Sequence, residues 1–257
     1  MGQKAVQGNE KLAKQIKLRR NELGLTIEEA ASRAGVGTKT WSRYEAGESI
    51  RKDKCKGICK ALNWHNLPDQ DHEETDRISI RETKKHKAWS KSLERRFGPG
   101  AAMSFAIGSD LLLDHLNEDL AELAALPIGT HIGQLGASWL KDLLPAQFLM
   151  EYNYEFLHLM KCTLRGLRES ANKGLFIIAH SVLDELIIYL CSEEASGLIE
   201  LSGGVYEMED DDESFKEWVF DLFDGMNLVT CLYSDIHLDE NHIYHFSHWK
   251  DQQFYMD

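Results

Sequence analysis

The sequence predicts an all-α protein in which a small N-terminal domain precedes a larger, mainly helical domain. Apolar residues recur at intervals of three and four rather than alternating, which is typical of helices. Only four prolines occur among the 257 residues, so few positions interrupt helical segments. Charge also divides the chain, because residues 1–65 contain 14 Lys or Arg against 7 Asp or Glu, whereas residues 66–257 contain 15 against 35. This contrast predicts two domains with different partners.

The stretch between residues 24 and 47 predicts two short helices joined by a tight turn. Thr26 is placed to accept a hydrogen bond from the first turn of the first helix, and Glu29 is placed to reciprocate, which together form a capping box. Gly35 follows this helix, where the chain needs a left-handed backbone. Two helices joined in this way allow a protein to lay the second one in the major groove of DNA.

The second helix of the pair has two different faces. Trp41 and Tyr44 fall at helical spacing and are expected to pack inward. The opposite face carries short polar and basic side chains, which suit contacts with base edges and phosphates. Thr40 of the same helix and two nearby lysines complete the set. The predicted DNA-binding residues are Thr38, Lys39, Thr40, Ser42, Arg43, Lys52 and Lys54. Among these, Lys39 suits the acceptors of guanine, whereas Arg43 is expected to reach a phosphate.

Amphipathic helices are expected on both sides of this pair. Residues 11–23 form the first, residues 50–63 form another with Asp53 as a candidate cap, and residues 64–67 are expected to add a short fifth turn. Five such helices over about residues 10–67 resemble the phage-repressor class of helix-turn-helix domain, often called Xre-type. The resemblance implies a five-helix fold, double-stranded DNA as the ligand and transcriptional repression as the role.

Two positions depart from the pattern of that class. Ile27 directly follows the capping threonine, where the family usually has a glutamine that holds a DNA phosphate, so Lys or Arg elsewhere must anchor the duplex. Gly37 stands where the family often has Ser or Thr, and it is a weaker but tolerated cap for the second helix. The alternative is a helix-turn-helix that contacts only protein. The positive charge of residues 1–65 favours DNA.

Residues 68–97 are predicted to be a charged linker and a basic connector helix. Five acids between residues 69 and 76 are followed by eight bases between Arg77 and Arg96. We expect the basic helix to be solvated and to pair with the acidic domain that follows. A second contact with DNA is the alternative.

Residues 98–257 are predicted to form an acidic helical domain for regulation or oligomerisation. Ser109 is expected to cap a helix, residues 145–172 to form a long helix, and residues 175–194 to form the central buried helix because they are apolar nearly all round. Residues 229–233 are expected to be an isolated strand or a buried extended piece. Large apolar runs without a catalytic constellation predict a homodimer, with a protein partner or a small-molecule effector bound to this domain.

The remaining candidate sites carry little chemistry. The five cysteines lack the spacing of a disulfide frame or zinc site, so free thiols in a reducing cytoplasm are expected. His237, His242, His245 and His248 fall close together, but a metal needs them to converge. The neighbouring aromatic residues favour a packed, structural role for these histidines. We therefore expect no metal, no cofactor and no catalytic residue.

These observations predict a sequence-specific DNA-binding transcriptional regulator, a repressor that acts as a cytoplasmic dimer and is not an enzyme. An antitoxin-like protein that binds a partner and regulates its own operator is the first alternative. A metal-dependent enzyme with a DNA-binding appendage, using the segment from His237 to His248, is the second.

Overall fold

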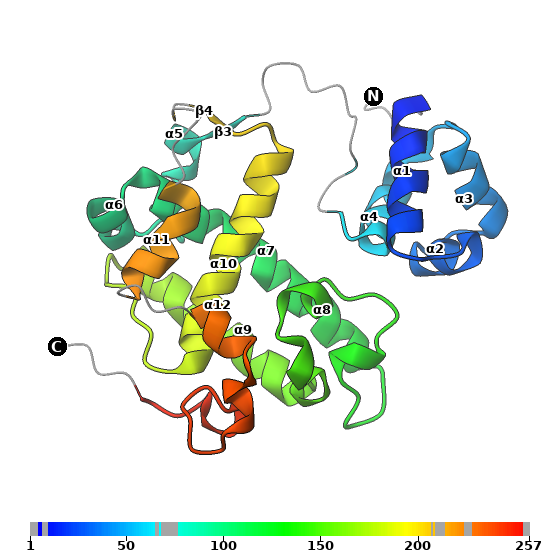
Figure 1. Ribbon diagram of the computed structural model, residues 1–257. Helices are drawn as coiled ribbons and strands as arrows, with labels where there is room; N and C mark the ends of the chain where they lie inside the picture. The colour runs from blue at the N-terminus through cyan, green and yellow to red at the C-terminus, as the bar shows by residue number, and fades with distance from the viewer. Residues whose placement is uncertain are drawn as a thin grey trace. The chain divides into compact units, whose positions relative to one another are not determined.

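The computed structural model describes residues 5–6, 10–64, 67, 77–206, 208, 214–223 and 228–253. It divides into two compact units (Figure 1). The N-terminal unit comprises residues 1–76 with 136–139, and the larger unit comprises residues 77–135 with 140–257. Each unit has a buried apolar cluster, and the fold belongs to the all-α class, as predicted. Across the described residues, no helix is both long enough and apolar enough to cross a membrane.

The N-terminal unit has the helices that the sequence predicts, with small shifts at their ends. They are α1 (Glu10–Glu22), α2 (Ile27–Arg33), α3 (Thr38–Glu45) and α4 (Lys52–Leu62). The last helix begins two residues later than expected, because β2 (Ile50–Arg51) pairs antiparallel with β1 (Ala5–Val6). The predicted fifth turn at residues 64–67 includes residues 65 and 66, which lie outside the described part of the chain.

Local signals in the sequence account for the ends of α2. The Thr26 hydroxyl accepts from the Glu29 amide at 3.1 Å, and the Glu29 carboxylate accepts from the Thr26 amide at 2.7 Å. Gly35 has a φ of 63°, in the left-handed region that favours glycine. The predicted cap of α4 is wrong, since Arg51 is the N-cap residue and Asp53 lies inside the helix.

The apolar cluster of the N-terminal unit brings all four helices together. Leu12 and Ile16 of α1, Trp41 of α3 and Ile58 of α4 are each 0–1% exposed. Gly57 permits the closest approach, because a Cβ there would lie only 2.3 Å from the Ala34 carbonyl oxygen. These contacts fix the turn between α2 and α3 against α4.

The larger unit is built around two long helices. Its helical elements are α5 (Ile80–Thr83), α6 (Lys91–Phe97), α7 (Pro99–Leu123), α8 (Leu140–Leu143), α9 (Tyr154–Asn172), α10 (Val182–Leu201), α11 (Ser214–Leu222) and α12 (Leu228–Leu232). Short 3₁₀ turns are η1 (Ile132–Gln134), η2 (Ala146–Glu151), η3 (Asp235–Leu238) and η4 (Phe246–His248). One parallel pairing joins β3 (Ile78–Ser79) to β4 (Val205–Tyr206).

Helix α10 is the buried centre of this unit, as predicted. It packs against α7, α9 and α11 (Figure 1). It begins at Val182 rather than residue 175, because Ser181 caps it by accepting a hydrogen bond from the Asp184 amide. It approaches α7 closely at Gly108, where a Cβ would lie 1.7 Å from the Cys191 carbonyl oxygen.

Two buried polar pairs involve side chains of α10. His115 of α7 lies 3.0 Å from the Glu194 carboxylate, measured from Nδ1. The Tyr244 hydroxyl donates to Glu185 at 3.1 Å. Burial raises the pKa of Glu185 to about 8, so this carboxyl keeps its proton at neutral pH and can share the hydrogen bond without a buried charge.

The basic segment from Arg77 to Arg96 does not form the predicted connector helix. It contains β3, α5, a turn and the start of α6. Ile80, Trp89 and Leu93 are at most 8% exposed and belong to the apolar cluster of the larger unit. A straight, solvated helix would leave these side chains in water, so folding back is favoured by their burial.

Three further predictions in the larger unit are wrong in detail. Ser109 lies inside α7, where its hydroxyl donates to the Ala106 carbonyl oxygen. The predicted helix over residues 145–172 is divided, since Asn153 caps α9 and the residues before it form η2. Residues 228–232 form α12 rather than a strand. A helical turn pairs backbone groups locally, whereas a lone strand leaves them unpaired.

Candidate nucleic-acid interface

Helix α3 presents its predicted polar face to solvent. Thr38, Lys39, Ser42 and Arg43 are exposed, and Thr40 is half-buried. On the other side, Trp41 and Tyr44 are 0% and 5% exposed, as the helical spacing predicts. The structure therefore gathers the predicted residues of this helix on one surface.

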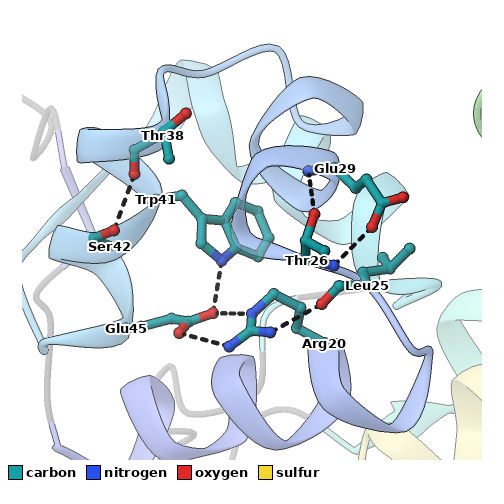
Figure 2. A network of polar contacts seen from close by, with 8 residues as sticks. All are labelled: Arg20, Leu25, Thr26, Glu29, Thr38, Trp41, Ser42 and Glu45. Atoms are coloured by element: carbon teal, nitrogen blue, oxygen red, sulfur yellow. Dashed lines mark hydrogen bonds and ion pairs between the residues drawn. The ribbon is translucent and has the colours of Figure 1, made fainter.

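A buried polar network fixes the inward side of α3 to α1 (Figure 2). The Arg20 guanidinium donates to both carboxylate oxygens of Glu45, at 2.6 and 3.1 Å, and to the Leu25 carbonyl oxygen at 2.9 Å. The Trp41 indole donates to the same carboxylate at 2.7 Å. The bond to Glu45 raises the pKa of Arg20.

The sequence indicates this network only in part. The signal available was the spacing of Trp41 and Glu45, which are four residues apart and therefore share one side of a helix. The contribution of Arg20 depends on how α1 crosses α3, which spacing along the chain does not reveal. The network fixes the orientation of α3 without using any residue of its exposed face.

One contact on the exposed face affects how it can meet a base pair. The Ser42 hydroxyl donates to the Thr38 carbonyl oxygen at 3.1 Å, one helical turn earlier (Figure 2). With its proton directed to the backbone, the Ser42 oxygen presents lone pairs outward. It is then suited to accept from an amino group such as adenine N6.

Arg43 is held in an ion pair. Its Nε and Nη2 atoms lie 2.8 and 2.5 Å from one carboxylate oxygen of Glu48. The pair raises the pKa of Arg43 and lowers the pKa of Glu48. Both side chains are well exposed, at 65% and 49%, so the pair lies on the surface of the unit.

A pocket of about 470 Å³ lies beside α3. Its lining consists of Gly35, Val36, Gly37, Thr40, Arg43, Tyr44, Glu48, Ser49, Arg51 and Lys54. Lys54 also reaches the turn between α2 and α3, where its ammonium donates to the Gly35 carbonyl oxygen at 3.4 Å. The pocket thus joins three predicted residues, Thr40, Arg43 and Lys54, with Arg51, which is not in the predicted set. The side chain of Lys52 lies outside the described part of the structure.

The histidine-rich segment near the C-terminus does not form one helical face. Turns and the short η3 and η4 carry these histidines, and the described imidazoles contact local groups. His248 Nε2 lies 2.6 Å from the Glu240 carbonyl oxygen, and His245 Nδ1 lies 2.7 Å from the Ser247 hydroxyl. Within the described ranges, no three His, Cys, Asp or Glu side chains come together as possible metal ligands.

Comparison with known proteins identifies part of the chain. A family model described as a helix-turn-helix domain matches residues 11–64, which contain α1 to α4 almost completely. No match was found among the curated proteins or among the solved structures. The N-terminal unit therefore carries a helix-turn-helix domain, as its sequence predicts.

Proposed function

We propose that this protein is a cytoplasmic, sequence-specific transcriptional regulator that represses by occupying its operator, and that it is not an enzyme. The observation that carries the proposal is the exposed polar and basic face of α3 within a helix-turn-helix domain. Helices of this kind read base edges from the major groove. Thr38, Lys39 and Ser42 are assigned to base reading, and Arg43 to phosphate.

Charge supports the same assignment. Residues 1–65 have a formal net charge of +7, from 14 bases and 7 acids, whereas the rest of the chain is strongly acidic. Phosphate neutralisation requires positive charge near the duplex, and like charge keeps the acidic residues away from it. DNA is therefore expected to contact the N-terminal unit alone.

We expect the full chain to bind duplex DNA with an affinity that falls steeply as salt rises. Each neutralised phosphate contributes roughly 0.9 to the slope of log affinity against log salt. Fluorescence anisotropy with a labelled duplex, taken from sequences selected out of random DNA, measures this slope. Lys39→Ala should weaken binding, because α3 loses an exposed positive charge.

Lys173→Ala is the matched control for that variant. It removes the same charge from an exposed lysine of the larger unit, where the partner is Glu169. Its affinity should equal that of the unchanged protein. Absence of duplex binding at low salt, or a flat response to salt, would contradict the proposed function.

The larger unit is proposed to pair two copies on DNA. One recognition helix spans few base pairs, and two half-sites about one helical turn apart supply the missing discrimination. This unit exposes adjacent apolar side chains at Leu175 and Phe176, at 55% and 58%. We expect light scattering to give a dimer for the full chain and a smaller fraction of dimer for Phe176→Ser. A full-length monomer that binds its operator singly and tightly would contradict the pairing.

A further inference from the structure

We propose that Glu48 is a built-in competitor for DNA, which holds Arg43 in the free protein and releases it to a phosphodiester on binding. The inference rests on the proposed DNA binding and adds a regulatory residue to it. Among the side chains that the structure describes, Glu48 is the only acidic one lining the pocket beside α3, and three basic residues line it with Glu48: Arg43, Arg51 and Lys54.

The chain returns toward α3 immediately after that helix ends. Gly47 has a φ of 91°, a left-handed conformation that a side chain would oppose. The Glu48 amide then donates to the Arg43 carbonyl oxygen at 3.0 Å. Arg43 and Glu48 are thus joined twice, through a backbone hydrogen bond and through the ion pair. The turn at Gly47 therefore positions the Glu48 carboxylate against the guanidinium.

This ion pair differs from the buried arginine–glutamate pair of the unit. Arg20 and Glu45 are 10% and 8% exposed, whereas Arg43 and Glu48 are 65% and 49% exposed. Buried pairs are costly to separate, but water and salt screen exposed ones. Arg43 can therefore exchange its partner without disturbing the apolar cluster.

A phosphodiester is the chemical class that suits the exchange. Phosphate and carboxylate oxygens are both strong acceptors for a guanidinium. If a phosphate binds the Nε and Nη2 edge of Arg43, the Glu48 carboxylate gives up its bonds and then lies near a second negative charge. Both effects oppose binding, and they oppose it for every DNA sequence, since neither involves a base.

The test compares full-length Glu48→Gln with the unchanged protein. Glutamine keeps the size of the side chain and removes its charge. We expect roughly three- to tenfold tighter binding to both operator and random-sequence duplex at low salt, because a repulsive charge and a competing partner are lost. The slope against log salt should steepen by up to about 0.9, the value of one phosphate.

Glu22→Gln is the matched control, since Glu22 is exposed and pairs with Arg19 at 3.3 Å in the same unit. It makes the same change in net charge away from the pocket and should leave affinity nearly unchanged. In an Arg43→Ala background, Glu48→Gln should have a much smaller effect, because the partner for which it competes is absent. Thermal melting of each variant verifies that it is folded.

The outcomes separate the two proposals. Equal gains in affinity for Glu48→Gln and Glu22→Gln would overturn the competitor role and leave DNA binding intact. So would an undiminished gain in the Arg43→Ala background. If the unchanged, folded protein fails to bind duplex DNA at low salt, the proposed function fails, and the role of Glu48 fails with it.

Discussion

Glu45→Ala is expected to lower the free energy of unfolding of the N-terminal unit by about 3–5 kcal/mol, the range for removing one partner of a buried ion pair. The change leaves the Arg20 guanidinium buried without its carboxylate and removes the acceptor of the Trp41 indole. Urea unfolding followed by far-UV circular dichroism measures the loss. DNA binding should disappear at temperatures where the variant unfolds.

The double variant Arg20→Met/Glu45→Leu is the informative control. It removes both charges and supplies apolar groups of similar size, which is often nearly neutral for stability. We expect the double variant to recover most of the free energy of unfolding that Glu45→Ala loses. Glu48→Ala, in the exposed pair, should change stability little. The double variant could instead lose as much free energy of unfolding as the single variants Arg20→Met and Glu45→Leu lose together. That result would show that the two side chains are not coupled.

Gly108→Ala is expected to destabilise the larger unit by about 3 kcal/mol or more, at or above the upper end of overpacking costs. The added methyl would lie 1.7 Å from the Cys191 carbonyl oxygen, so α7 and α10 must separate. Alanine is otherwise the better helix former, by roughly 1 kcal/mol, and the steric cost must exceed that gain. Urea unfolding of the full chain measures the net effect.

Gly166→Ala supplies the control for this prediction. Gly166 is an exposed glycine in α9, and a Cβ there would have no atom within 4 Å. The substitution should therefore raise the free energy of unfolding by roughly 0.5–1 kcal/mol. Changes of the same sign in the two variants would contradict the close approach of α7 and α10.

Sequence reasoning succeeds in this protein where the signal is local. The capping box of Thr26 and Glu29 lies within four residues, and the positive φ of Gly35 follows from one position. The inward placement of Trp41 and Tyr44 needs only the period of a helix. These features define the helix-turn-helix and hence the orientation of the candidate site.

Sequence reasoning fails where contacts between distant parts of the chain determine the local structure. Arg20 meets Glu45 across 25 positions, and Glu48 meets Arg43 only because the chain turns at Gly47. Ser109 is a residue type that often caps helices. The residues before it bury enough apolar surface, however, that α7 begins already at Pro99. Such outcomes depend on tertiary packing, which overrides local preference.

The two faces of α3 also bear on how such a regulator can diversify. Trp41 and Glu45 tie the helix to its unit from within, whereas Thr38, Lys39 and Ser42 face solvent. Substitutions at exposed positions usually alter stability by no more than about 0.5 kcal/mol. If the proposed function holds, new operator preferences are accessible to selection, or to an engineer, by exchange of three outward side chains on an unchanged scaffold.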